Sequence, residues 1–356
     1  MSIDPSLLRT RDLPTGYRSG AKRIIVAGSL PELNIEAGQL ICLLGPNGSG
    51  KSTLLRTLAG LQPALGGTIH IGGAERGTPA ELAKRISLVL TDRVRGNNLT
   101  VYSLIALGRY PYSGWLGGLD EADKAAVEWA IESTGVEALR HRKVHTLSDG
   151  ESQKVMLARA LAQDTPILML DEPTAHLDLP SRIRLMRLLH RLARQTRKGI
   201  LLSTHELDLA LQVADEVWLL QPGGGFYKGA PEDLVLDGIF EAAFANEDIH
   251  FDREAGTFVI HTEAGKPIGF SGEGAVASGE GGVASLERAV ASAERAIAFW
   301  TERALRREGY VVVAPGSAPH TVRLCREGSG FRWRLEAGKT VIEYDSISGL
   351  LQALRG

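Results

Sequence analysis

Short apolar runs alternate with longer helical patterns through the first two-thirds of the chain. Runs of strand length lie at residues 37–44, 86–90, 166–170, 199–203 and 216–220. Helical patterns lie between or after them, at residues 51–59, 121–132, 151–163, 180–196 and 206–214. Strands that alternate with helices predict a mainly parallel sheet covered on both faces, and therefore an α/β fold.

A different pattern begins after residue 245. Residues 265–282 are rich in glycine, which is typical of a flexible linker. Beyond them, six residues recur at spacings of three and four and predict an amphipathic helix that ends near Gly309: Leu286, Val290, Ala293, Ile297, Trp300 and Ala304.

The last part of the chain predicts strands and one more helix. Strand-like runs lie at residues 310–314, 321–325, 331–335 and 340–344, and Ser346 can cap a helix that ends near Arg355. We therefore predict a first domain over residues 1–245, a linker over 246–285 and a small α+β domain over 286–356.

Composition and charge narrow the class of protein. Hydrophobic residues make up 44% and charged residues 23%, which excludes disorder across the whole chain. The 40 basic residues balance 42 acidic ones, so the charge does not favour binding to nucleic acid. Two cysteines, Cys42 and Cys325, cannot build a disulfide framework. We expect no signal peptide, since the first twenty residues lack an apolar block, and no membrane span, which needs about 20 apolar residues.

A glycine-rich turn follows the first predicted strand. Its residues, Gly45-Pro46-Asn47-Gly48-Ser49-Gly50-Lys51-Ser52, match the pattern G-x-x-x-x-G-K-[ST] and open a helix. Glycines let backbone N–H groups surround a polyphosphate, and the helix N-terminus adds partial positive charge. We expect Lys51 to reach the β- and γ-phosphates and Ser52 to ligate Mg²⁺. This segment, extended to Thr53, predicts a nucleotide-binding site, and the loop alone does not distinguish a kinase, a GTPase and a transport ATPase.

Two carboxylates end a later apolar strand, Ile167-Leu168-Met169-Leu170-Asp171-Glu172. Asp171 is expected to hold Mg²⁺, and Glu172 is placed to act as the general base for the attacking water. Three more short motifs occur in the chain: Leu147-Ser148-Asp149-Gly150-Glu151, Leu177-Asp178 and Ser203-Thr204-His205.

In this order the motifs resemble those of an ABC-transporter ATPase subunit, over about residues 5–245. The resemblance implies a P-loop NTPase of the ABC type, with a mixed-sheet core and a helical subdomain at about residues 92–163. LSDGE is a variant of the family's LSGGQ signature that is usual in its iron-complex importers. The segment Gly108-Arg109-Tyr110-Pro111-Tyr112 and residues 155–163 also resemble the subgroup that imports ferric siderophores, haem or cobalamin.

The resemblance also implies roles for single residues. Two copies would enclose two ATP molecules, and the segment Leu147–Glu151 of one copy would complete the site of the other. Ser148 would offer its hydroxyl, and Gly150 its N–H, to the γ-phosphate. His205 would contact the same phosphate, Asp178 would lie at the dimer interface, and Tyr17 would stack on adenine. The family usually carries a glutamine near residue 91; here Thr91, with Asp92 as the alternative, is the candidate contact to the metal or its water.

As partners the resemblance implies a second copy of the chain, two copies of a polytopic permease and, indirectly, an extracytoplasmic binding protein. The protein would act peripherally at the cytoplasmic face of the inner membrane, with Tyr110, Tyr112 and Trp115 as candidate permease contacts. The alternatives are a soluble ABC ATPase that acts on ribosomes or nucleic acid, and a binding module without chemistry. The C-terminal domain would have a regulatory or dimerising role, or would only pack against the ATPase domain.

Overall fold

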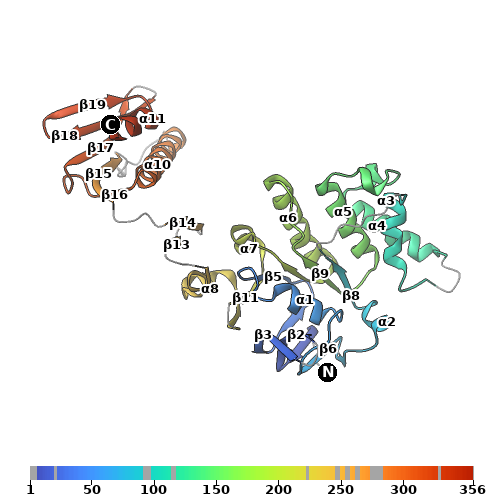
Figure 1. Ribbon diagram of the computed structural model, residues 1–356. Helices are drawn as coiled ribbons and strands as arrows, with labels where there is room; N and C mark the ends of the chain where they lie inside the picture. Colours follow the sequence, from blue (N-terminus) through green and yellow to red (C-terminus); the bar gives the residue numbers. More distant parts are fainter. Residues whose placement is uncertain are drawn as a thin grey trace. The chain divides into compact units, whose positions relative to one another are not determined.

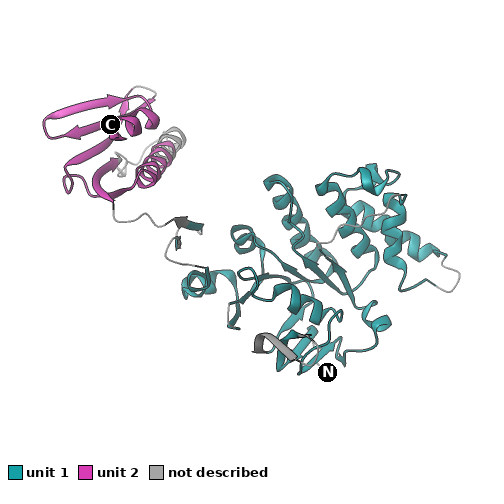
Figure 2. Ribbon diagram, viewed as in Figure 1, with its two compact units in different colours: residues 1–245, 251–258 teal, residues 246–250, 259–356 magenta. Residues whose placement is uncertain are grey.

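The computed structural model describes residues 6–19, 22–90, 98–113, 118–221, 224–244, 249–252, 257–260, 265–272, 284–327 and 330–355. The chain divides into two compact units (Figure 2). Unit 1 comprises residues 1–245 and 251–258, and unit 2 comprises residues 246–250 and 259–356. Among the described residues, no helix combines the length and the apolar character that crossing a bilayer requires.

A six-stranded sheet forms the centre of unit 1 (Figure 1). Its strands, in spatial order, are β12 (Phe226–Gly229), β11 (Glu216–Leu220), β5 (Leu40–Leu44), β10 (Gly199–Ser203), β9 (Ile167–Asp171) and β8 (Ile86–Val89). The five strands from β11 to β8 are parallel and β12 is antiparallel. The mainly parallel sheet predicted from the sequence is therefore present.

Alternate residues of the central strands pack into two separate hydrophobic cores, one on each face of the sheet. Leu40, Cys42 and Leu44 pack with α6 (Leu179–Thr196), α7 (Leu207–Val213) and α5 (Asp149–Ala162) on one face. Ile41 and Leu43 pack with α1 (Lys51–Leu58) on the other. All five residues of β5 are fully buried, which explains why this strand is apolar throughout instead of alternating.

On either side of β5 and α1 in the sequence, the chain forms antiparallel strands for which the sequence analysis made no prediction. β4 (Asn34–Glu36), β1 (Ser6–Arg11), β6 (Thr68–Ile71) and β7 (Ala74–Glu75) form one sheet, and β2 (Leu13–Ser19) pairs with β3 (Lys22–Leu30). Leu8, Ile69 and Ile71 of this sheet join the core that contains α1. These strands are short or only half apolar, so their pattern is weak in the sequence.

The helical subdomain consists of α3 (Val101–Ala106), the 3₁₀ turn η1 (Leu107–Arg109), α4 (Glu121–Thr134) and α5. An ion pair joins its helices: Arg109 Nε lies 2.8 Å from Asp123 Oδ1, and Arg109 Nη1 donates to the carbonyl of Ala162 at 2.9 Å. Both charged residues are buried. The hydrogen bond from Arg109 keeps the pKa of Asp123 below its usual range. Arg109 thus links the segment before α4 to the end of α5.

Shorter helices complete unit 1, namely α2 (Pro79–Leu82), η2 (Glu137–Leu139), η3 (Val144–Thr146), α8 (Pro231–Leu236) and α9 (Ile239–Phe244). Phe240 and Phe244 of α9 pack with Phe251 and Phe258, which lie on the paired strands β13 (Ile249–Asp252) and β14 (Thr257–Ile260). The rings of Phe251 and Phe258 are 4.9 Å apart. This aromatic cluster fixes residues 251–258 of the predicted linker to unit 1.

Unit 2 is a five-stranded sheet with two helices. The strand order is β16 (Tyr310–Val313), β15 (Lys266–Gly272), β17 (His320–Glu327), β18 (Gly330–Ala337) and β19 (Thr340–Tyr344). The helices are α10 (Ala284–Arg307) and α11 (Ile347–Arg355). Ile268 of β15 is fully buried in the core that these helices cover.

Two predictions for this region are wrong. The boundary predicted at residue 286 is too late, because β15 lies inside the predicted linker and pairs with β16 and β17. Its glycines serve close packing: a Cβ on Gly269 would lie 2.6 Å from Thr321 Oγ1. Trp300 was expected on the buried face of α10, but it is 56% exposed. Thr301 is buried instead and accepts a hydrogen bond from Trp333 Nε1 at 2.8 Å.

Candidate functional site

The glycine-rich turn leads from β5 into α1, as the motif predicts. Gly45 has φ +148°, and a Cβ there would lie 2.4 Å from the carbonyl oxygen of Leu220, so only glycine fits. Lys51 is 5% exposed, and its Nζ donates to the carbonyls of Gly45 at 2.8 Å and Pro46 at 3.1 Å. Burial lowers the pKa of Lys51, while Glu172 and Asp171 act in the opposite direction. The two carbonyl groups therefore hold the ammonium group of Lys51 against the backbone of the turn.

The hydroxyl groups of this turn are placed to meet a phosphate and a metal. Ser49 Oγ is buried and has no hydrogen-bond partner within the described part of the chain, and such a group is stabilised when a ligand supplies one. Ser52 Oγ donates to Asp171 Oδ1 at 3.0 Å, although 119 residues separate the two. A hydroxyl and a carboxylate are hard oxygen donors of the kind that Mg²⁺ prefers. The remaining predicted residues, Asn47, Gly48, Gly50 and Thr53, lie in the same turn or in the first turn of α1.

The predicted base and the predicted histidine lie side by side. His205 Nε2 is 2.8 Å from Glu172 Oε1, and both side chains are partly exposed. Glu172 has φ +49°, an unusual left-handed conformation for a residue other than glycine. Such backbone conformations concentrate at functional sites. At this distance the two side chains contact each other directly, and a water molecule beside the pair can be held by His205 while Glu172 removes its proton.

The LSDGE segment forms the N-terminus of α5. Ser148 is the N-cap residue: its backbone N donates to Glu151 Oε2 at 2.8 Å, and its Oγ accepts from the N–H of Glu151 at 3.3 Å. This capping box stabilises the helix start and keeps the pKa of Glu151 below its usual value, chiefly through the backbone hydrogen bond. Glutamate at the fifth position of the segment therefore has a local structural reason. Leu147, Asp149 and Gly150 flank the cap.

The other residues predicted for the dimer interface, the adenine, the metal and the permease lie apart from the glycine-rich turn in the sequence. Asp178 caps α6 by accepting from the N–H of Ser181 at 3.0 Å. Hydrogen bonding from the side chain of Ser181, and secondly from its backbone N–H, lowers the pKa of the Asp178 carboxyl. Tyr17 lies on β2, which packs against α1, and is 46% exposed. Thr91, Asp92 and Trp115 lie outside the described residues. Tyr110 is 79% exposed, whereas the ring of Tyr112 is 4.1 Å from the guanidinium carbon of Arg109.

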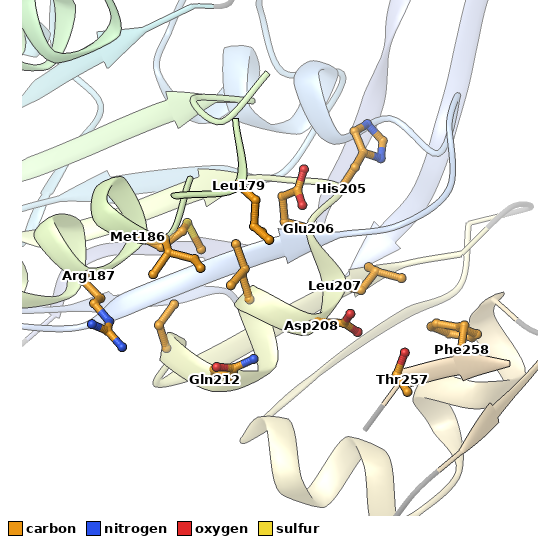
Figure 3. Close-up of a pocket in the computed structure, with 13 residues that line it drawn as sticks. Leu179, Met186, Arg187, His205, Glu206, Leu207, Asp208, Gln212, Thr257 and Phe258 are labelled. Atoms are coloured by element: carbon orange, nitrogen blue, oxygen red, sulfur yellow. The ribbon is translucent and has the colours of Figure 1, made fainter. Parts of the chain in front are cut away.

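A groove of about 640 Å³ lies beside the His205 loop, between α6, α7 and β14 (Figure 3). Leu179, Leu207 and Phe258 line it together with Asp208, whose pKa is raised by burial and by the charge of Glu206. Of the predicted site residues it contains only His205. The groove therefore belongs to the edge of the site and not to the nucleotide-binding turn.

Comparison with known proteins identifies the family. The family model described as ABC transporter matches residues 31–175. The achromobactin transport ATP-binding protein of Dickeya dadantii is 35% identical over 239 residues, which are 67% of this chain and 87% of that relative. The chain belongs to the ABC transporter ATP-binding proteins. It is therefore an ABC ATPase, as the order of its motifs predicts.

Two further comparisons support this assignment. The iron(3+)-hydroxamate import ATP-binding protein of Bacillus subtilis is 31% identical over 67% of this chain and 87% of its own length. A solved ATP-binding subunit of an ABC transporter is 27% identical, with a TM-score of 0.56, and the match covers 68% of this chain and 97% of that one. The family resemblance stated from the motifs is thus confirmed.

A second family model matches the part of the chain that carries none of these motifs. It is described as iron ABC transporter C-terminal domain and covers residues 291–355. The sequence analysis predicted a small α+β domain there but found no functional motif in it. The match covers α10 from residue 291 onwards, the strands β16–β19 and α11, but not β15.

Proposed function

We propose that this ABC ATPase energises the uptake of an iron chelate, either a ferric siderophore or haem, or of cobalamin, through a membrane permease. The observation that carries the proposal is the combination of an ABC ATPase unit with an iron ABC transporter C-terminal domain in one chain. Two of the relatives are an achromobactin transport and an iron(3+)-hydroxamate import ATP-binding protein, and this supports an iron-chelate cargo.

The geometry supports a separate role for each site residue in binding and hydrolysing ATP. The turn from Gly45 to Thr53 binds the triphosphate, and Lys51 turns from the loop carbonyls towards the β- and γ-phosphates. Ser52 and Asp171 hold Mg²⁺, which neutralises phosphate charge when it is bound. Glu172 accepts the proton of the attacking water, and His205 holds that water in place. Tyr17 stacks on the adenine.

Completion of the site requires a second copy of the chain. Ser148 and Gly150 at the N-terminus of α5 face solvent in a shallow pocket of about 220 Å³, together with Gln153 and Lys154. A helix N-terminus with a hydroxyl and free N–H groups suits the γ-phosphate of a nucleotide bound to another protomer. Hydrolysis is then coupled to closure of the dimer, with Asp178 at the interface.

A groove of about 440 Å³ between α5 and the elements α2 and β8 is the proposed permease contact. Leu61, Leu82, Leu88 and Met156 line it, and Leu61 is 61% exposed. Arg159 also lines the groove, and burial lowers its pKa. An apolar groove of this kind accepts a short amphipathic helix. The protein would therefore work at the cytoplasmic face of the membrane, next to a permease that takes its cargo from an extracytoplasmic binding protein.

Replacement of Arg159 should separate transport from basal hydrolysis. Its guanidinium stays charged, and no ion pair or hydrogen bond of this side chain occurs within the described part of the chain. An acidic or carbonyl-rich end of the permease helix would supply its partner. Arg159→Glu should lower uptake by about tenfold or more and leave the ATPase rate of the isolated subunit unchanged. The control is Arg191→Ala, which changes an exposed arginine of α6. If the Arg159→Glu variant takes up as much cargo as this control, Arg159 does not contact the permease.

The function itself is tested by uptake in cells of the source organism. Deletion of the gene should abolish accumulation of radioiron supplied as a ferric siderophore or as haem, or of labelled cobalamin, and the wild-type gene should restore it. A deletion strain that takes up all of these labels normally would contradict the proposal. Binding of the purified chain to RNA in a salt-dependent manner would then favour the alternative, a soluble ABC ATPase that acts on ribosomes or nucleic acid.

A further inference from the structure

Ser203 occupies a fully buried position next to Asp171 and Glu172. It is the last residue of β10 and lies beside Asp171 in the parallel register with β9. Its hydroxyl donates to Asp171 Oδ1 at 2.7 Å. The same oxygen accepts a hydrogen bond from the backbone N–H of Glu172 at 2.9 Å. One hydroxyl group therefore touches both the proposed metal carboxylate and the backbone of the proposed base.

The second of these bonds bears on the backbone of Glu172. The N–H of Glu172 also donates to the carbonyl oxygen of Ser203, at 3.2 Å. Two oxygen atoms of Ser203, one in the side chain and one in the backbone, therefore accept from the same N–H group. Glu172 has φ +49° at this point, a conformation that persists only when its surroundings enforce it. This conformation turns the chain at the end of β9, and the carboxylate of Glu172 then lies next to His205, only two residues beyond Ser203.

We infer that Ser203 is a positioning residue for the ATPase reaction: its hydroxyl orients Asp171 towards the metal and holds Glu172 in the conformation that activates water. The inference rests on the proposed function, because it assigns Ser203 a role in a site whose metal and water are proposed there. Asp171 Oδ1 accepts hydroxyl bonds from both Ser203 and Ser52, so the two serines together hold this carboxylate in one orientation. Hydrogen bonds of this kind fix the orientation of a metal-binding carboxylate.

The test compares Ser203→Ala with Ser203→Thr and with a matched control, Ser87→Ala. Ser87 is also buried in the central sheet and accepts a hydrogen bond from Thr165 Oγ1 at 3.0 Å, but it lies on β8 opposite Leu168, within the strands and not at their site-bearing ends. Both alanine variants remove one buried hydroxyl. Only the first removes a hydroxyl that contacts Asp171 and Glu172.

Three measurements on the full chain are needed: kcat and KM for ATP, the Mg²⁺ concentration that gives half-maximal rate, and binding of a fluorescent ATP analogue with Mg²⁺ or with EDTA. Ser203→Ala should lower kcat about tenfold or more and raise the half-saturating Mg²⁺ concentration by a similar factor. Its binding of the analogue in EDTA should equal that of the wild type, which also shows that the variant is folded. Ser203→Thr should retain more activity than Ser203→Ala, and Ser87→Ala should behave as the wild type.

The role of Ser203 is overturned if Ser203→Ala keeps the wild-type kcat and Mg²⁺ dependence, or if Ser87→Ala shows the same losses. A wild-type chain without Mg²⁺-dependent ATPase activity contradicts the proposed function itself. An active wild type with an unchanged Ser203→Ala variant contradicts only the role of Ser203.

Discussion

Glu172→Gln should slow ATP hydrolysis by about 100-fold or more and leave ATP binding intact. The amide has the size of the carboxylate but cannot take a proton from water. The groups proposed to bind phosphate, Lys51 and the loop before it, are not altered, and Lys51 Nζ is held by the carbonyls of Gly45 and Pro46. The ATP-bound dimer should therefore accumulate, because the step that opens it is blocked.

Two measurements check this result: steady-state phosphate release, and size-exclusion chromatography with and without ATP. Glu206→Gln is a suitable control, since Glu206 lies one residue after His205 but bonds to Arg182 at 2.7 Å. That variant should hydrolyse ATP at nearly the wild-type rate and should not accumulate a dimer. Full activity of Glu172→Gln would show that another group accepts the proton.

Arg109→Ala should destabilise the ATPase unit by about 3 kcal/mol. The substitution leaves the carboxylate of Asp123 buried without its ion-pair partner and removes the bond to the carbonyl of Ala162. It also removes the surface against which the ring of Tyr112 stacks. These contacts connect the segment before α4 with the end of α5, so the helical subdomain should lose its packing. The free energy of unfolding in urea, followed by circular dichroism, measures the loss.

A double variant distinguishes a buried unpaired charge from a general packing defect. Arg109→Met combined with Asp123→Asn leaves no charge at this position, and asparagine can still accept from the N–H of Asp120, which now donates to Asp123 Oδ2 at 3.2 Å. The double variant should therefore be more stable than Arg109→Ala alone. If the double variant is as unstable as the single one, packing of the arginine stem, and not its charge, determines the stability here.

The burial of Arg109 and its ion pair with Asp123 were not predicted from the sequence. The segment Gly108–Tyr112 was interpreted as a marker of the importer subgroup, with Tyr110 and Tyr112 as permease contacts. In the structure Gly108 and Arg109 are buried, and Tyr112 packs on Arg109, while Tyr110 is exposed. The partner of Arg109 is Asp123, on the following helix. No spacing rule pairs these two residues, because they belong to separate elements, η1 and α4, that meet through tertiary packing.

The sequence by itself determined the elements whose chemistry is local. Each of four segments is made of consecutive residues, so residue types and order identify it: the glycine-rich turn before α1, the carboxylates at the end of β9, the LSDGE segment at the start of α5, and Thr204–His205. The apolar runs of the central strands were identifiable for the same reason, since a strand buried on both faces is apolar throughout.

Only the tertiary structure decided how these segments meet. Ser52, Asp171 and Ser203 come from three separate parts of the chain, and their contacts depend on the order and register of β5, β10 and β9. The place of β15 in the C-terminal sheet and the exposure of Trp300 depend in the same way on partners distant in sequence. Periodicity along a chain shows which face of an element is buried, but the residue that it packs against is set by contacts between elements far apart in the sequence.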